Sequence, residues 1–361
     1  MPSARALALL ALKIAVSVAL LAWIFRPGKL HWSELAWARG GVDGTLVVAG
    51  LAVAGLYLVL SALRFGIVLR AFGLLCPPGH VFAIVLISHA FSFVARGPVA
   101  GTASRIAMVM HDHPERKAAA TLAVLGDHVG APFAAGLAGV IALVWRWHDL
   151  APHPVLGQPY VLAAGLVVGL VAMVFPFVVV HLLGRPAGPD RADGDSPGRI
   201  RHWQAMAGRM RAEPAALILG SLVSLPLLLA YFGTFVAGAA MVRAPVRVAD
   251  ILTALPAVDL VASLPVSLAG LGVREKAFQS IPAAIGGTSA AAAVSLSLAG
   301  LSLLAAWAGP GPWVGAAAGG VAGVAASGCG RAGAQGAGRW GGTTRPVGAG
   351  RRVFGDWRGG G

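Results

Sequence analysis

Long apolar runs separated by short polar connections make up most of this chain. The runs close to the roughly 20 residues that a helix needs to cross a bilayer are 6–25, 45–63, 118–144, 160–183, 215–241 and 283–307. The first run is followed by a basic stretch with Pro and Gly and by no small-residue cleavage site, which favours a membrane helix over a signal peptide. The pattern predicts an all-α polytopic membrane protein with about six full spans.

Two further apolar stretches are interrupted. Residues 81–95 are apolar but too short for a full span, and a second short apolar half follows the Gly/Pro segment 96–101 at 106–110. Residues 251–268 contain two prolines and an acid and run into the Gly-rich segment 270–275. These breaks predict two re-entrant or broken hairpins of opposite orientation, as in the inverted repeats of many transporters. The alternative is that they are ordinary kinks in a packed bundle.

The distribution of Lys and Arg supports the first hairpin. If every apolar run crossed the membrane and the N-terminus lay inside, 6 basic residues would lie inside and 15 outside when the tail is excluded, against the positive-inside tendency. A re-entrant 81–110 changes the distribution to 13 inside and 6 outside before the second break. This topology predicts a multi-pass protein of a bacterial-type inner membrane, with both termini in the cytoplasm.

Composition excludes several other classes. Hydrophobic residues make up 57% of the chain and charged residues 12%, whereas a soluble domain carries roughly 25% charged residues. The soluble, coiled-coil and disulfide-scaffold classes are therefore excluded. The net charge of +14 comes mostly from connections between apolar runs, so we expect no nucleic-acid partner. We expect a transmembrane domain at 1–308, a basic cytoplasmic loop within it at 184–214, and a Gly/Arg-rich tail at 309–361 that is disordered or aberrant.

Ionisable residues at membrane depth are the candidates for function, because each is costly unless it is paired or hydrated. They are Arg96, Arg105, Asp127, His128, Asp259, Arg274 and Glu275. In a functional interpretation, arginines hold a phosphate headgroup in a hydrated cavity. In a structural interpretation, Asp127 neutralises Arg96 or Arg105 and fixes the hairpin to a neighbouring helix.

The sequence offers no sign of an enzyme. It has no nucleophile with a placed base, no metal-ligand spacing and no phosphate-binding Gly loop followed by Lys. The densest group of metal-ligand residue types, His-Asp-His at 111–113, is interpreted as a solvated loop. We therefore expect no catalytic residue, no metal and no cofactor.

The second break contains a motif that resembles a known family. Residues 264–275 read Leu-Pro-Val-Ser-Leu-Ala-Gly-Leu-Gly-Val-Arg-Glu. This is similar to the Pro-x-Ser-x-x-Gly-x-Gly-x-Arg-Glu signature of the lysylphosphatidylglycerol synthase transmembrane family. The matching positions are Pro265, Ser267, Gly270, Gly272, Arg274 and Glu275.

Three weaker likenesses follow the family's order. Residues 63–74 resemble its Arg-rich exit from the second helix, 97–105 its Pro-Gly-x-x-Gly-Gly-Asp-x-x-Arg hairpin, and 125–130 its Asp-Arg-x-x-Gly element. The residues that carry the last two likenesses are Gly97, Pro98, Gly101, Arg105, Asp127 and Gly130. The chain departs from the family at Thr102, where the hairpin has Asp, and at His128, where the later element has Arg.

The resemblance implies a helical domain that moves, or assists in moving, an anionic phospholipid or related lipid between leaflets, without a synthase domain. Arg105 and Arg274 would contact the phosphate, Asp127 and Glu275 would keep these arginines in place, and Arg96 and His128 belong to the same predicted site. Two other functions are open at this point. One is a non-transporting accessory protein of lipid or envelope biosynthesis, and the other is a gradient-coupled transporter with Asp127 or Asp259 as the coupling carboxylate.

Overall fold

The computed structural model describes residues 15–16, 18–20, 22–26, 32–35, 41–94, 98–128, 130–151, 158–183, 214–262 and 272–310. Within these ranges the regular elements are helices, as predicted. They are η1 Trp32–Glu34, α3 Gly44–Ala71, α4 Pro78–Val94, α5 Pro98–Asp112, η2 Pro114–Arg116, α6 Lys117–Asp127, α7 Gly130–Trp145, α8 Trp147–Leu150, α9 Pro159–Leu183, α11 Pro214–Met241, α12 Val248–Ala262, α13 Val273–Gly286 and α14 Ala290–Ala306.

Three stretches of the described chain are long and apolar enough to cross a membrane: Gly44–Ala71, Pro114–Trp145 and Ile218–Met241. Shorter apolar helices occupy Pro78–Phe93, Pro159–Phe175 and Ala290–Ala306. These lengths establish a membrane protein, and the total of about six full spans stays a prediction.

The long helices α3 and α11 pack side by side and run in opposite directions. The backbone N–H of Asp43, just before α3, donates to the carbonyl of Met241 at the end of α11 (2.9 Å). Asp43 also caps α3, since its carboxylate accepts from the backbone N–H of Thr45 and Leu46. The prediction that the second helix ends at Arg64 is wrong: α3 continues to Ala71, because a carboxylate from another helix neutralises the arginine.

Helices α4 and α5 form a hairpin at the first predicted break. The imidazole Nε2 of His80, near the start of α4, lies 2.7 Å from a carboxylate oxygen of Asp112 at the end of α5, so the two open ends meet. Helix α5 begins at Pro98, earlier than the predicted half at 106–110. Proline suits this position because the first helical residue needs no N–H donor.

Helices α12 and α13 occupy the second predicted break and pack against each other. The predicted last span, 283–307, starts too early. Helix α13 runs to Gly286, and α14 begins at Ala290 after Ser289, whose hydroxyl accepts from the N–H of Ala292. The serine cap supplies the local signal for this start.

The two hairpins follow matching turns. After α3, Gly73 has φ 71°, and Leu74 donates its N–H to the carbonyl of Leu69 (2.9 Å). After α11, Arg243 has φ 52°, and Ala244 donates to Ala239 at the same distance. Each long helix is therefore followed by the same left-handed turn and then by a hairpin.

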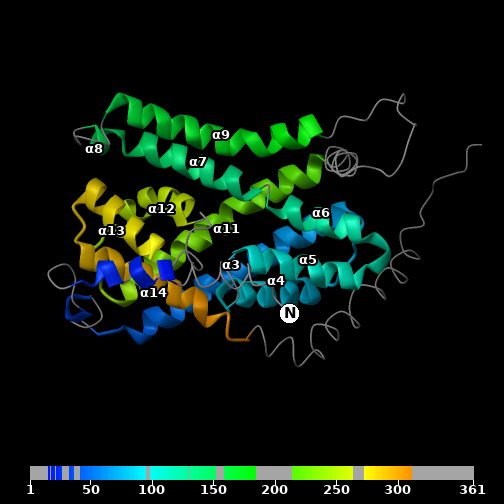
Figure 1. Cartoon of the computed structure of the whole chain (residues 1–361), viewed down its shortest axis with the longest axis horizontal. Coiled ribbons are helices and arrows are strands. Elements are labelled where there is room, and N and C mark those ends of the chain that lie inside the picture. Colours follow the sequence, from blue (N-terminus) through cyan, green and yellow to red (C-terminus); the bar gives the residue numbers. More distant parts are fainter. Residues whose placement is uncertain are drawn as a thin grey trace, which may run out of the picture.

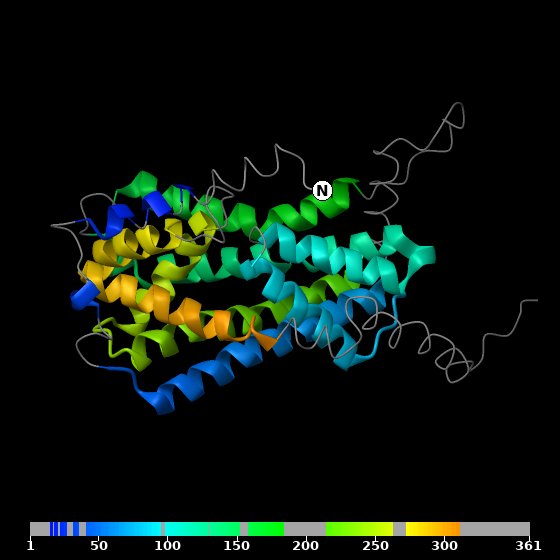
Figure 2. The same cartoon turned by 60° about the horizontal axis from the view of Figure 1, so that its bottom comes forward.

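The hairpins lie at opposite ends of the molecule. Figure 1 shows α4, α5 and α6 at one end and α12 and α13 at the other, and the turned view of Figure 2 shows the same separation. Helices α7 and α9 form a further pair along one side. Because α3 and α11 are antiparallel, this arrangement is the one that an inverted repeat requires.

The predicted span 118–144 is divided into α6 and α7, which meet near His128. The lack of a side chain at Gly130 allows the start of α7 to approach α11, because a Cβ here would collide with the Ser224 hydroxyl and lie 3.3 Å from the carbonyl of Gly220. Asp127, the last residue of α6, contacts Arg64 of α3 and Arg105 of α5.

Candidate functional site

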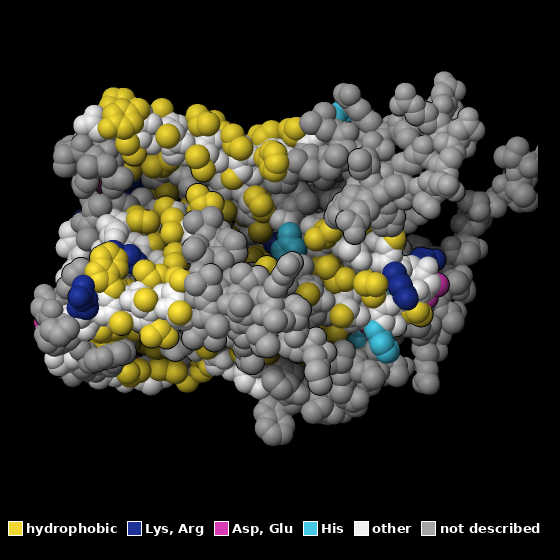
Figure 3. Space-filling view, in the orientation of Figure 1, with side chains coloured by type: hydrophobic (Ala, Val, Ile, Leu, Met, Phe, Trp, Pro, Cys, Tyr) yellow, Lys and Arg dark blue, Asp and Glu magenta, His cyan; other side chains and the backbone are white. Residues whose placement is uncertain are grey.

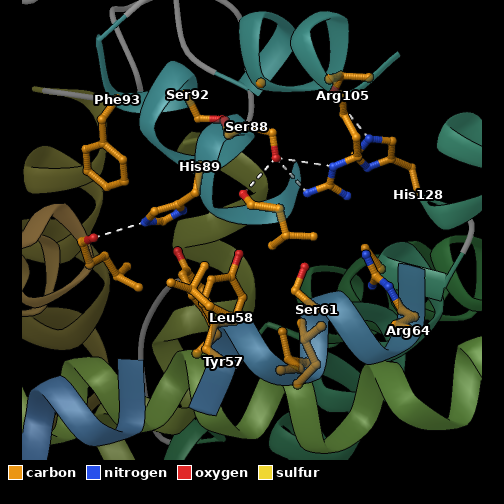
Figure 4. A pocket seen from close by; sticks show the side chains of 18 of the residues that line it. Tyr57, Leu58, Ser61, Arg64, Ser88, His89, Ser92, Phe93, Arg105 and His128 are labelled. Carbon is orange, nitrogen blue, oxygen red and sulfur yellow. Dashed lines mark hydrogen bonds between the residues drawn. The ribbon is translucent and has the colours of Figure 1, made fainter. Parts of the chain in front are cut away.

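A cavity of about 360 Å³ is lined by both halves of the molecule, the first formed by α3 and the hairpin α4–α5 and the second by α11 and the hairpin α12–α13. It is walled by α3, α4, α5, α11 and the junction of α6 and α7, by Arg274 of α13, and by Leu301 and Leu304 of α14 (Figure 4). Its polar lining residues are Tyr57, Ser61, Arg64, Ser88, His89, Ser92, Thr102, Arg105, His128, Tyr231 and Arg274. Three arginines from different helices thus face one small space.

Arg64 and Arg105 share one buried carboxylate. Asp127 accepts from Arg64 Nε at 2.8 Å and Nη2 at 3.1 Å, and from Arg105 Nη1 at 2.8 Å. The side chain of Asp127 is fully buried. Two guanidinium groups and one carboxylate leave one positive charge, which faces the cavity since both arginines line it.

Hydroxyl groups and an aromatic ring hold these arginines in place. Ser88 accepts from Arg105 Nη2 at 3.1 Å, and Ser224 accepts from Arg64 Nη1 at 3.1 Å. The guanidinium carbon of Arg105 also lies 4.9 Å from the centre of the Phe65 ring, within the range of a cation–π contact. Both cations are therefore positioned before any ligand binds.

Arg274 approaches the cavity from the second hairpin. Its Nη2 donates to the Tyr231 hydroxyl at 3.3 Å and lies 3.8 Å from a carboxylate oxygen of Asp259. Tyr231 in turn donates to Asp259 at 2.9 Å, so the hydroxyl bridges the acid and the base. The Nε of Arg274 is buried and has no hydrogen-bond partner within the described structure.

The departures from the family motif lie together at the cavity. Thr102 Oγ1 is 3.1 Å from His128 Nε2, and both residues line the cavity. A hydroxyl–imidazole hydrogen bond thus occupies the positions where the motif has an acid and a base. Figure 4 shows His128 beside Arg105, and Figure 3 shows histidine and basic side chains in a depression near the middle of this face.

Aromatic side chains form the wall between the two groups of arginines. Tyr57 lies between His89, at 6.3 Å between ring centres, and Tyr231, at 5.6 Å. His89 is fixed by a hydrogen bond from its Nε2 to the carbonyl of Leu304 (3.0 Å) and by an edge contact with Phe93. This wall belongs to both halves, since α3, α4 and α11 all contribute.

The structure brings four of the predicted site residues together. Arg105, His128 and Arg274 line the cavity, and Asp127 lies behind two of its arginines. The predicted role of Glu275 differs. Its carboxylate accepts from the Gly272 N–H (2.5 Å) and the Ser297 hydroxyl (3.2 Å), while the acid that pairs with Arg274 is Asp259.

The motif glycines that the structure describes act through close packing and backbone conformation. A Cβ on Gly101 would lie 2.7 Å from the Ser88 carbonyl and collide with the Ser92 hydroxyl, so glycine lets α5 pack against α4. Gly272 has φ 82°, a left-handed conformation that favours glycine. Arg96, Gly97, Pro265, Ser267 and Gly270 lie outside the described residues, as does the side chain of Pro98.

Sequence reasoning missed several residues of the site. They are Tyr57, Ser61, Arg64, Ser88, His89, Ser92 and Tyr231. For Arg64 a signal exists, because the apolar pattern continues through residues 65–69 and so places the charge inside a helix. The serines and tyrosines carry no such signal, since hydroxyl groups are common in membrane helices.

Among the described residues, which include the histidine-rich turn at 111–113, no group of three or more His, Cys, Asp or Glu could hold a metal ion. Asp112 pairs with His80, and His113 Nε2 lies 3.6 Å from Cys76 Sγ. Burial lowers the pKa of His113 below its usual value. This turn lies apart from the arginine-lined cavity.

Comparison with known proteins points in the same direction as the motifs. A family model for the transmembrane region of lysylphosphatidylglycerol synthase matches residues 10–309. A search of curated proteins found no match. The matched region contains every described residue of the cavity.

Proposed function

Because the chain belongs to the lysylphosphatidylglycerol synthase transmembrane family, we propose that it is a lipid translocase that moves a phospholipid or related lipid between leaflets. The family ties the protein to lipid biosynthesis or translocation. One observation favours translocation itself: arginines from both halves, Arg64 and Arg105 from the first and Arg274 from the second, line the same cavity.

The cavity suits a phosphate group. Guanidinium groups bind phosphate through paired N–H donors, and they retain their charge at membrane depth. Arg274 offers a buried Nε that has no hydrogen-bond partner among the described residues, and Arg64 and Arg105 contribute a net positive charge after Asp127 is counted. A bound phosphate would satisfy both features.

The position of the cavity suits translocation. A lipid headgroup cannot cross the hydrocarbon region without losing its hydration, and the cost is large for a charged group. The two hairpins lie at opposite ends of the molecule, and both contribute to the cavity, the first through α4 and α5 and the second through Arg274. In the proposed mechanism each hairpin connects the site with one membrane surface. The headgroup would bind between them while the acyl chains stay in lipid.

Within this mechanism the residues have separate roles. Arg105 and Arg274 hold the phosphate from opposite sides, and Arg64 adds a third cation. Asp127 keeps Arg64 and Arg105 oriented, and Asp259 with Tyr231 does the same for Arg274. The location in an inner membrane with cytoplasmic termini follows from the distribution of Lys and Arg alone and belongs to the same proposal.

The test is transport by the purified protein in vesicles. The probe is phosphatidylglycerol with a fluorescent acyl chain, and its exposure to a membrane-impermeant quencher is followed in time. We expect Arg274→Gln to slow translocation at least about tenfold, because a site-facing cation is lost. Arg243→Gln is the control, since Arg243 is 66% exposed at the end of α11 and lies outside the cavity.

Two results would contradict the proposal. One is wild-type translocation no faster than that of protein-free vesicles, which would favour the accessory protein. The other is equal translocation by wild type and Arg274→Gln at equal protein abundance. Rates that depend on an imposed proton or sodium gradient would favour the coupled transporter instead.

A further inference from the structure

The chemistry of the cavity lining points to a particular class of headgroup. We infer that the cavity selects a singly charged phosphodiester that carries hydroxyl groups, such as a glycerol or sugar phosphate headgroup, and excludes headgroups with an ammonium group. This inference rests on the proposed function, and it concerns what the cavity accepts. Three features carry it: the described residues that line the cavity include no acid, neutral hydrogen-bonding groups are numerous among them, and the cavity is small.

No Asp or Glu is among the described residues that line the cavity. The two carboxylates that pair with the cavity arginines are already engaged, and Glu275 accepts from the Gly272 N–H and the Ser297 hydroxyl. Asp127 is fully buried between Arg64 and Arg105, and Asp259 accepts from Tyr231 and pairs with Arg274. Neither can pair with an ammonium group unless it gives up an arginine.

The one position where the family motif carries an acid at the cavity is Thr102, whose hydroxyl lies 3.1 Å from His128. The replacement therefore removes the carboxylate that a positively charged headgroup would need.

The charge of the site fits one negative charge. Three arginines and two carboxylates leave one uncompensated positive charge at the cavity. A phosphodiester carries one negative charge and neutralises it. An additional ammonium group would be desolvated beside three guanidinium groups without a compensating anion, which is strongly unfavourable.

Neutral hydrogen-bonding groups surround the charged ones. Tyr57, Ser61, Ser92, Thr102 and Tyr231 line the cavity together with the arginines. Hydroxyl groups both donate and accept, so they match the hydroxyl groups of a glycerol or sugar. At about 360 Å³ the cavity is near the lower end of the range for small-molecule sites, which suits a headgroup without its acyl chains.

The test compares four acyl-labelled lipids in the same vesicles. Phosphatidylglycerol has the charge and the hydroxyl groups, and phosphatidylmethanol has the charge alone. Phosphatidylethanolamine and phosphatidylcholine carry an ammonium group, and choline is included because aromatic rings attract quaternary ammonium. We expect phosphatidylglycerol to move at least about tenfold faster than either ammonium lipid, with phosphatidylmethanol in between.

A substitution at Thr102 makes the inference sharper. Thr102→Asp places a carboxylate at the cavity, so we expect it to raise the rate for the ammonium lipids and lower the rate for phosphatidylglycerol. Thr102→Asn is the matched control, with nearly the same shape and no charge, and should keep the wild-type order. An unchanged order of rates in a folded Thr102→Asp protein would overturn the role of the missing acid.

A binding experiment tests this inference independently of the proposed function. Native mass spectrometry of the detergent-purified protein with equimolar amounts of the four lipids measures headgroup preference without transport. Preferential retention of phosphatidylglycerol supports the inference even if no lipid is translocated, a result that would overturn the proposed function only. Equal retention or equal transport of phosphatidylglycerol and an ammonium lipid would overturn the inference. Equal retention and transport of phosphatidylmethanol and phosphatidylglycerol would overturn the claim that the cavity recognises headgroup hydroxyl groups.

Discussion

The two carboxylates beside the cavity differ in how tightly they hold their arginines. Asp127 makes three hydrogen bonds of 2.8–3.1 Å to two guanidinium groups and is shielded from solvent. Asp259 lies 3.8 Å from Arg274, is linked to it through the Tyr231 hydroxyl, and leaves 25% of its side chain exposed. Within the described part of the chain, the donors and acceptors of the first arrangement all have partners, whereas Nε of Arg274 in the second has none.

This difference indicates two kinds of contact. Asp127 with Arg64 and Arg105 forms a structural clamp, and Asp259 with Arg274 forms a weaker contact that can open. The Asp127 cluster joins α3 and α5 to the end of α6, so breaking it exposes buried charges to each other. The Asp259 pair joins α12 to α13 within one hairpin and to α11 through Tyr231. A ligand phosphate therefore competes more easily for Arg274 than for Arg64.

The largest effect should come from removing the charge of the clamp. Asp127→Asn leaves Arg64 and Arg105 buried without a counter-ion, which typically costs about 3–5 kcal/mol. Asp259→Asn should cost only about 1 kcal/mol, because its ion pair is longer and partly exposed. The measurement is thermal unfolding of the detergent-purified proteins, followed by tryptophan fluorescence.

A double variant checks the cause. Replacing Arg64 by Gln in the Asp127→Asn protein removes one of the two uncompensated charges, so part of the lost stability should return. Equal thermal shifts for Asp127→Asn and Asp259→Asn would mean that the two carboxylates do not differ as the geometry indicates.

A smaller effect, seen mainly in transport, should come from Tyr231→Phe. The ring stays in the aromatic wall, and only the hydroxyl that bridges Asp259 and Arg274 is lost. We expect the translocation rate to fall several-fold with little change in thermal stability, since a single hydrogen bond between membrane helices is worth about 0.6 kcal/mol on average. A fall in stability as large as that of Asp127→Asn would instead place Tyr231 in the structural clamp.

The broken elements of the fold could be predicted from the sequence because their signals are local. Short apolar halves, Gly and Pro at 96–101, and the distribution of basic residues all indicate the first hairpin. The end of α3 could not be predicted in the same way. Whether Arg64 ends a helix or lies inside one depends on Asp127, a residue from a different helix.

The site itself was only partly predictable for a related reason. Arg105, Asp127 and Arg274 stand out in apolar surroundings, and all three lie at the cavity or directly behind it. Glu275 stands out equally, yet it follows Arg274 on a helix, where neighbours point about 100° apart. Its carboxylate therefore faces Ser297 and the start of α13, whereas the partner of Arg274 comes from α12.

The smallest effect should come from Ser224, which contacts Arg64 of the clamp. Ser224 on α11 accepts a hydrogen bond from Arg64 Nη1 (3.1 Å) and donates to the Gly220 carbonyl, but Arg64 keeps two bonds to Asp127 without it. Ser224→Ala should therefore cost about 0.6 kcal/mol and leave the translocation rate unchanged, because Ser224 does not line the cavity. Ser224→Thr is the control that keeps the hydroxyl. If Ser224→Ala slowed translocation as much as Tyr231→Phe does, the orientation of Arg64 would depend on α11 as strongly as on Asp127, and the distinction between the clamp and the opening contact would fail.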